Sequence, residues 1–426
     1  VVGRSQARNG GARRVNARSV SGATLLALLA MPCAVPAQQA EDREGQRLLS
    51  DSARVSLVTI LPGKKVYSLF GHNAIRIVDP PRGIDIAYNY GTFRFGSPLT
   101  FTAKFAYGDL NYRLARQNYA DMVAYYPAEE GRPLVEQWLD LDADQKEALF
   151  RFLEWNALPE NAFYRYDFYY DNCATRIRDA FEELLGENLE AHRSDPDRTM
   201  RQLLDPYLVE KPLLHLGMDF AQGVPADAPA TGRDELFLPD RLAEWMADAR
   251  IRGPEGYRPL VSRTDSIGWT LERARLDAAP PWPAILFCAF LALVVWLTFR
   301  DVRSGRRSRV WLDVPLFAFL GIAGLFVVFV WFFSLHPVAK RNVHILWVIP
   351  THVVLAWTLA RSKRPGWMSL YLWATAALAA VFVGGLPFWR QEVPLALVPL
   401  VLAILIRSAG LALISGRSVT EQPDSL

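Results

Sequence analysis

Apolar and polar positions are distributed differently in the two parts of this chain. Up to about residue 280, charged and apolar residues are mixed, whereas residues 283 to 414 consist mostly of apolar runs. Each run is close to the about 20 residues that a helix needs to cross the hydrocarbon of a bilayer. The pattern predicts five membrane-spanning helices, at Pro283 to Phe299, Trp311 to Leu335, Val343 to Ala360, Trp367 to Leu386 and Pro394 to Ile414.

The charges of the short loops predict how these helices are oriented. The first loop, the third loop and the C-terminal tail (415–426) carry nine basic residues: Arg300, Arg303, Arg306, Arg307, Arg309, Arg361, Lys363, Arg364 and Arg417. The other two loops carry three: Lys340, Arg341 and Arg390. By the positive-inside rule the first helix runs inward, so residues 38 to 282 lie outside the cytoplasm. Arg407 interrupts the fifth segment, and we expect its side chain to extend toward the nearer membrane surface.

The N-terminal segment, residues 1 to 37, has the features of a secretory signal peptide. Five arginines precede the apolar run ATLLALLAMPCAV, and Val35-Pro36-Ala37 provides a small-residue cleavage site. We expect cleavage near Gln38 and the loss of Cys33 with the leader, with a retained anchor as the alternative. The chain is thus predicted to lie in the cytoplasmic (inner) membrane as a multi-pass protein with a periplasmic domain.

The predicted periplasmic domain, residues 38 to 252, mixes strands and helices. Residues 55 to 60 read as a strand, and residues 73 to 90 as two strands joined by the turn Asp79 to Gly83. Asp142 and Gln145 form a capping box for a helix to about Asn156. A second helix, roughly 172 to 185, begins at Asp171-Asn172 and stops at Gly186. The fold class is therefore α+β, and residues 253 to 282, rich in Pro and Gly, are expected to form a stem.

Composition narrows the possible classes of function. The chain has 426 residues, 51% of them hydrophobic, and 47 Lys and Arg against 44 Asp and Glu give a net charge of only +3. This balance argues against nucleic-acid binding. The sequence has no Cys-x-x-Cys, HExxH or compact His and Asp cluster, so it predicts neither a metal site nor a cofactor.

Cysteine usage gives the most informative chemical signal. Of three cysteines, Cys33 is expected to leave with the leader and Cys288 lies within the first span, so Cys173 is alone outside the membrane. It occupies the first turn of the predicted helix 172 to 185, where free amides and the helix dipole favour a thiolate. It also belongs to an apolar stripe with Ile177, Ala180, Phe181 and Leu184, so periodicity alone leaves nucleophile and packing residue equally open.

A cysteine nucleophile needs a base, and His72 is the best candidate. It opens a predicted strand beside Gly71, whereas His192 and His215 lie in polar or Pro-flanked sequence typical of solvated histidines. On the following strand Asn89 projects from the face opposite the apolar one. There it is positioned to orient the imidazole, as the third member of a triad does, or it is a polar residue near the turn at Gly91.

Several neighbouring residues are candidates for substrate binding. Asn172 and Tyr170 adjoin the thiol, and the Tyr-rich run from Phe163 to Tyr170 either packs in the core or lines a groove for an acyl chain. Arg132 and Arg176, like Arg165 and Arg178, either meet phosphate head groups or form ion pairs.

Four ordered motifs carry a family resemblance: SLFGHNAIRI at 68 to 77, YNYGTFRF at 88 to 95, EEGRPLVEQWLDL at 129 to 141 and YRYDFYYDNCATRIRD at 164 to 179. With them the chain resembles bacterial membrane proteins that have an Lnb-type N-terminal periplasmic domain. The resemblance extends to residues 332 to 337 (FFSLHP) and Asn342 at the outer ends of the second and third spans. His336 and Asn342 either dock a head group or serve as an interfacial histidine and a helix cap.

The resemblance implies both a fold and an activity. In that family the domain is similar to a circularly permuted papain or NlpC/P60 fold in which histidine precedes cysteine, an order that His72 and Cys173 follow. It implies that Cys173 is the nucleophile and His72 its base. Members related to the Bacteroides enzyme look like lipoprotein N-acyltransferases, which take an acyl chain from a phospholipid or lipoprotein donor to a lipoprotein's N-terminal amine.

Two other functions remain open at this level. One is a papain-like thiol hydrolase of peptidoglycan peptides or lipids, which would release free products instead of an acylated lipoprotein. The other is a periplasmic binding or sensor module in which Cys173 only packs.

Overall fold

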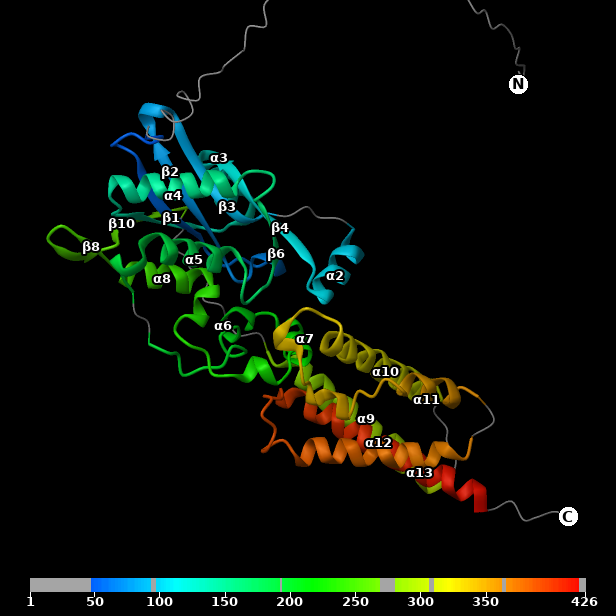
Figure 1. Ribbon diagram of the computed structural model, residues 1–426. Helices are drawn as coiled ribbons and strands as arrows, with labels where there is room; N and C mark the ends of the chain where they lie inside the picture. The colour runs from blue at the N-terminus through cyan, green and yellow to red at the C-terminus, as the bar shows by residue number, and fades with distance from the viewer. Residues whose placement is uncertain are drawn as a thin grey trace, which may run out of the picture. The chain divides into compact units, whose positions relative to one another are not determined.

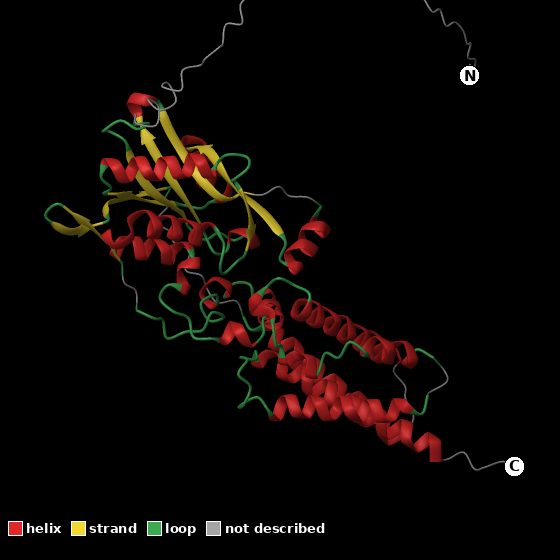
Figure 2. Cartoon of the chain, in the orientation of Figure 1, coloured by secondary structure: helices red, strands yellow, loops and turns green. Residues whose placement is uncertain are grey.

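The computed structural model describes residues 47–92, 97–191, 194–268, 280–305, 310–361 and 365–420 (Figure 1). The predicted signal peptide with Cys33, His192, and the basic residues Arg306, Arg307, Arg309, Lys363 and Arg364 lie outside the described residues. Strands occur only before residue 268 in the described part of the chain, and only helices follow (Figure 2). The structure thus has an α+β domain followed by a helical domain.

The α+β domain is built on one seven-stranded antiparallel sheet. Its strand order is β10-β5-β1-β2-β3-β4-β6. The strands are β1 (Arg54–Ile60), β2 (His72–Asp79), β3 (Ile84–Thr92), β4 (Leu110–Asn118), β5 (Leu134–Leu139), β6 (Phe163–Tyr166) and β10 (Val261–Ile267). The predicted strand at 55 to 60 and the predicted pair within 73 to 90 are confirmed as β1, β2 and β3. Gly83, with φ of 65°, closes the turn between β2 and β3.

Helices cover both faces of this sheet. Residues of α4, α5 and α8 form one core with Leu57, Ile75, Ile77 and Tyr88, and residues of α3 form another with Val58, Ala74 and Ala87. The alternation along each strand therefore separates two cores. The helices of this domain are α2 (Pro98–Tyr107), α3 (Tyr119–Glu130), α4 (Ala143–Asn156), α5 (Cys173–Leu185), α6 (Asp205–Leu208), α7 (Pro212–Ala221) and α8 (Pro239–Asp248).

Local capping signals predicted two of these helices correctly. Asp142 accepts a hydrogen bond from the Gln145 amide, and the Gln145 side chain accepts one from the Asp142 amide, which completes the predicted capping box of α4. The α5 helix starts after Asn172 and ends before Gly186, as predicted.

The predicted stem at 253 to 282 is wrong over its first half. Residues up to 267 belong to the domain: β8 (Arg250–Gly253) and β9 (Gly256–Pro259) pair in a small sheet with β7 (Leu189–Glu190), and β10 forms an edge of the main sheet beside β5. Gly256, with φ of 116°, lies in the β8–β9 turn, so the glycines that suggested a linker instead make a hairpin. Residues 269 to 279 lie outside the described residues.

The helical domain contains α9 (Trp282–Ser304), α10 (Val310–Phe332), α11 (His352–Leu359), α12 (Trp367–Gly384) and α13 (Val398–Thr420). Among the described residues, four helices are long and apolar enough to cross a membrane: α9, α10, α12 and α13. The third predicted span differs from the others. Residues Val343–Leu346 form a 3-10 turn, and α11 has only 8 residues. Pro350, which lacks an N–H, lies between the two pieces and helps to interrupt a continuous helix.

Arg407 does not extend to the membrane surface as predicted. Its side chain is fully buried in α13, with Nη2 3.0 Å from Asp301 of α9 and Nε 2.6 Å from Asp313 of α10. Two carboxylates inside the helix bundle offer the guanidinium a closer partner than the head-group region.

Candidate active site

Cys173 is the first residue of α5, and Asn172 is the helix cap. The Asn172 side-chain oxygen accepts hydrogen bonds from the amides of Ala174 and Thr175 at 2.8 and 3.0 Å. Its amide nitrogen donates to two backbone carbonyls in other segments, at Phe168 and Phe237. All polar atoms of Asn172 are therefore used in holding the start of α5, and with it the thiol, in place.

His72 and Asn89 come from adjacent strands, β2 and β3. Nε2 of His72 lies 2.6 Å from Oδ1 of Asn89, and Asn89 in turn donates a hydrogen bond from Nδ2 to Oε1 of Gln117 on β4 at 3.2 Å. Because Oδ1 only accepts, Nε2 carries the proton and Nδ1 remains free to act toward Cys173. Strands β2 and β3 thus bring His72 and Asn89 together, and the interaction of His72 with Cys173 places the imidazole beside the start of α5.

Gly91 occupies the space between the imidazole and the thiol. A Cβ placed on it would lie 3.5 Å from Cε1 of His72 and 3.8 Å from Cβ of Cys173, and its φ is 85°. A Cβ there would be in ordinary van der Waals contact with both residues, but the positive φ would strain any residue other than glycine. Gly91 is therefore favoured by its backbone conformation directly beside the base and the nucleophile.

Electrostatics favour a charged pair at this position. Burial acts to raise the pKa of the Cys173 thiol, but the adjacent His72 and the backbone N–H groups of Asn73 and Ala174 outweigh it, so the pKa lies below its ordinary value. Burial acts to lower the pKa of His72, but Cys173 and Asn89 outweigh it, so that pKa is raised. The two shifts together favour a thiolate beside an imidazolium, the reactive form of a cysteine nucleophile.

Aromatic rings from β4 and β6 form a wall near the thiol. Tyr112 of β4 packs against Tyr164 and Tyr166 of β6, with ring centroids 6.5 and 4.2 Å apart. Burial, with the nearby Cys173 adding to it, raises the pKa of all three phenols, so they stay protonated. Cys173 and Tyr112 belong to the same apolar cluster, and the thiol residue is itself 9% exposed.

The hydroxyl of Tyr164 is an exception to normal polar pairing. It is buried and has no hydrogen-bond partner within the described ranges, and it lies 3.9 Å from the Cβ that Gly91 would carry. The ring is held by the Arg176 guanidinium, 4.0 Å from its centroid, and by the edge of Tyr90. A buried hydroxyl that makes no hydrogen bond is unusual and costs free energy.

The other predicted substrate residues occupy different positions. Arg176 is paired with Asp171 through two hydrogen bonds at 2.6 and 2.8 Å. Tyr170 is half exposed, its backbone amide donates to the Asp167 carboxylate, and its ring lies beside that of Tyr169. Arg132 is buried and donates to the Leu61 carbonyl, whereas its Nη2 has no partner among the described residues.

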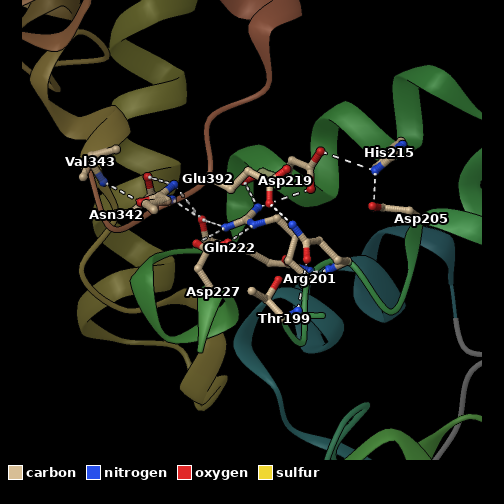
Figure 3. A network of polar contacts seen from close by, with 12 residues as sticks. Thr199, Arg201, Asp205, His215, Asp219, Gln222, Asp227, Asn342, Val343 and Glu392 are labelled. Atoms are coloured by element: carbon tan, nitrogen blue, oxygen red, sulfur yellow. Dashed lines mark hydrogen bonds and ion pairs between the residues drawn. The ribbon is translucent and has the colours of Figure 1, made fainter. Parts of the chain in front are cut away.

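His336 and Asn342 lie at the contact between the two domains and not beside the thiol. Nε2 of His336 is 2.6 Å from the carbonyl of Phe105 at the end of α2. The Asn342 amide donates to the carbonyls of Phe220 and Gln222, close to a network centred on Arg201 (Figure 3). Both residues therefore hold the α+β domain on the loops of the helical domain.

The same network corrects the prediction for His215. It lies in helix α7 and is half buried, with Nε2 3.0 Å from Asp205 and 3.5 Å from Asp219 (Figure 3). Arg201 pairs with Asp219 and Asp227. His215 is thus part of a structural ion-pair network and not a solvated loop residue.

Sequence reasoning did not assign roles to Gly91, Gln117 or Tyr164. Gly91 had a signal, because a glycine inside a strand often marks a bulge or a close approach. Tyr164 lies in the Tyr-rich run, but nothing in that run distinguishes it from its neighbours, since its place beside Cys173 depends on the pairing of β4 with β6.

Comparisons with known proteins agree with this two-domain structure. A family model described as the Lnb N-terminal periplasmic domain matches residues 45–206, and one described as the Lnb transmembrane domain matches residues 277–418. No curated protein and no solved structure matches the chain.

Proposed function

Because this chain belongs to the Lnb-type family of membrane proteins, we propose that it is a cysteine-dependent acyltransferase that modifies the N-terminal amine of bacterial lipoproteins. The observation that carries the proposal is the hydrogen bond from His72 to Asn89 beside a thiol at a helix start. A nucleophile, a base and an orienting group in this order form a recognised constellation for acyl transfer. We place the α+β domain on the periplasmic side of the inner membrane, in line with the loop charges.

The first half-reaction transfers an acyl chain to the enzyme. The Cys173 sulfur attacks the ester carbonyl of a phospholipid or of a lipoprotein glyceride, and Nδ1 of His72 holds the thiol proton. The carbonyl oxygen becomes an oxyanion. When the tetrahedral intermediate collapses, the ester C–O bond breaks and His72 gives its proton to the leaving alkoxide. The products are a thioester at Cys173 and a lyso-lipid.

Tyr164 is our candidate for stabilising the oxyanion. The amides of Ala174 and Thr175 already donate to Asn172, so the start of α5 supplies fewer free N–H groups than its position suggests. The Tyr164 hydroxyl is protonated, buried and unpaired within the part of the chain described here. A preorganised donor in a dry site is worth more than one in water.

The second half-reaction passes the acyl chain to the lipoprotein. The α-amine of its N-terminal cysteine attacks the thioester carbonyl, and His72 accepts the proton that the amine loses. The C–S bond then breaks, which yields an amide and regenerates the thiolate. The aromatic wall and the burial of Cys173 limit access of water, which favours an amine over hydrolysis.

Intact mass tests the first half-reaction. Purified protein is incubated with phospholipid vesicles without acceptor, as wild type and as the variants Cys173→Ser, His72→Ala and Cys288→Ser. We expect a hydroxylamine-sensitive acyl adduct on wild type and on Cys288→Ser only, because Cys288 lies in α9. A lipopeptide with a free N-terminal cysteine is then added, and loss of the adduct should match gain of N-acylated peptide.

The other outcomes separate the alternatives. Lysophospholipid and free fatty acid without acylated peptide would identify a thiol hydrolase. If Cys173 stays unmodified with phospholipid donors and also with lipoprotein donors, the acyl-enzyme is refuted. If cells that carry Cys173→Ser then behave like wild type, Cys173 is a packing residue in a binding module.

A further inference from the structure

Helix α2 connects the site to the helical domain. It lies in the connection between β3, which carries Gly91, and β4, which carries Tyr112. Its sequence, PLTFTAKFAY, is mostly apolar and has no acidic residue. Phe101 of α2 packs against the apolar cluster that contains Cys173. One part of this helix therefore faces the core around the thiol.

The other part of α2 exposes aromatic side chains. Phe105 is 46% exposed and Tyr107 is 41% exposed, although both are large aromatic residues near the end of the helix. Two neighbouring aromatic side chains in water raise the free energy of the folded domain, so this face is expected to have a partner.

The contacts of α2 show what lies beside this face. The amide of Leu335 donates to the carbonyl of Tyr107 at 2.7 Å, and the ring of Tyr107 lies 6.4 Å from that of Phe329 in α10. His336 binds the Phe105 carbonyl. Gly108 ends α2 with φ of 88°, and a Cβ there would lie 3.1 Å from Leu335. The end of α2 is thus attached to the end of a membrane-spanning helix.

The adjoining surface of α10 is also aromatic and exposed. Phe332 and Phe333 close this helix, and both side chains are more than half exposed. Aromatic residues at the ends of membrane helices lie at the level of the lipid head groups. Because Tyr107 packs against Phe329 and His336 is bonded to the Phe105 carbonyl, both residues adjoin this end of α10.

We propose that the exposed face of α2, formed by Phe105 and Tyr107, inserts into the interface of the phospholipid leaflet on the side of the α+β domain. Resting on the proposed function, we infer further that this face delivers the ester-bound acyl chain to Cys173. From Gly108, next to Leu335, strand β4 reaches Tyr112 of the aromatic wall in four residues, about 13 Å. One leaflet of hydrocarbon is about 15 Å thick, so an acyl chain spans this distance.

Insertion can be measured without activity. A polarity-sensitive NBD label is placed at Phe105→Cys in full-length protein that carries Cys173→Ser and Cys288→Ser, and the matched control places it at Tyr125→Cys. Tyr125 lies on α3 and is 48% exposed, so it resembles Phe105 in type and exposure. After reconstitution in phosphatidylcholine vesicles, we expect blue-shifted emission and quenching by head-group-proximal doxyl lipids at position 105 only. Equal spectra at positions 105 and 125 would overturn the insertion.

Delivery is tested by comparing two acyl donors. The double variant Phe105→Asp with Tyr107→Asp should form the Cys173 thioester from phospholipid vesicles about tenfold more slowly or worse, the loss expected when aromatic side chains can no longer insert into the lipid interface. With a monomeric short-chain ester its rate should change by less than about threefold. Tyr125→Asp should leave both rates unchanged.

The outcomes separate the two levels of the proposal. Equal losses with both donors would mean that α2 shapes the catalytic site and does not deliver lipid. If wild type forms no thioester with either donor, the proposed acyltransferase activity is refuted. The emission of the label at position 105 still decides whether α2 contacts the membrane.

Discussion

Nε2 of His72 donates to Oδ1 of Asn89 across 2.6 Å, from the first residue of β2 to the middle of β3. This bond fixes both the tautomer and the plane of the imidazole, and so leaves Nδ1 as the ring nitrogen available to Cys173. Asn89→Ala should slow formation of the Cys173 thioester by roughly 10- to 1000-fold, since a misplaced base loses much of its acid–base contribution.

A matched variant shows whether orientation is the cause. Gln117→Ala removes only the outer partner of Asn89 and should cost far less. The check is the single-turnover acylation rate of both variants beside their thermal unfolding. Equal rates for wild type and Asn89→Ala would mean that Asn89 is only a polar residue near a turn.

The coupled pKa shifts of Cys173 and His72 predict a defined pH dependence. The thiol pKa is lowered, so alkylation of Cys173 by iodoacetamide should rise with pH around a midpoint below that of an ordinary cysteine. The His72 pKa is raised, so protonation of the leaving group, and with it acyl transfer from an ester, should decline only above that raised value.

His72→Ala provides the comparison for this profile. Without the imidazolium, burial dominates and the midpoint for alkylation should move to higher pH. The measurement is the alkylation rate against pH, followed by intact mass in a Cys288→Ser background. An unchanged midpoint would show that His72 does not interact with the thiol.

Short-range signals explain which elements could be predicted from the sequence. The capping box of Asp142 with Gln145 and the turn that ends at Gly83 each depend on residues within one turn of chain. The stem was wrong because β10 is placed by pairing with β5, far earlier in the chain. Proline and glycine near 253 to 259 describe a hairpin as well as a linker.

The site shows the same division between local and distant information. Residue type and position in the predicted elements made Cys173, His72 and Asn89 candidates, and the family resemblance then implied the roles of Cys173 and His72. The register of β2 against β3, with Ile75 opposite Tyr88, brings His72 toward Gly91 and Asn89. Tyr164 reaches the thiol only through the pairing of β4 with β6, which no pattern within either strand reveals.

Arg407 was misjudged for a similar reason, and it leads to a stability prediction. Its partners Asp301 and Asp313 lie on two other helices, and all three side chains are fully buried. Arg407→Leu takes the guanidinium away from two buried carboxylates and should destabilise the protein by about 3–5 kcal/mol. Arg300→Leu, an exposed arginine on α9, should change stability by less than about 0.5 kcal/mol.

The triple variant Arg407→Leu, Asp301→Leu and Asp313→Leu separates pairing from packing. Because the two buried carboxylates are then replaced together with the guanidinium, most of the lost stability should return. Thermal unfolding in detergent compares the variants. A triple variant as unstable as Arg407→Leu alone would mean that the guanidinium contributes through packing and not through its charge.

The unpaired hydroxyl of Tyr164 allows a test in which rate and stability move differently. Tyr164→Phe removes one oxygen and keeps the ring contacts with Tyr90 and Arg176. Loss of an oxyanion donor should reduce the rate of acylation by about 10²- to 10³-fold. Since the hydroxyl has no partner among the described residues, the free energy of unfolding should stay the same or rise.

Tyr90→Phe is the opposite case in the same cluster. The Tyr90 hydroxyl donates to the Asn156 side chain at 2.6 Å in the core, so its removal should cost about 1–3 kcal/mol of stability with little effect on acylation. Acylation rate and thermal unfolding are measured for both variants. If Tyr164→Phe acylates as fast as wild type, the oxyanion is held by backbone amides alone, and the buried hydroxyl has another partner. If it loses stability as Tyr90→Phe does, the hydroxyl is a structural group and its rate effect is indirect.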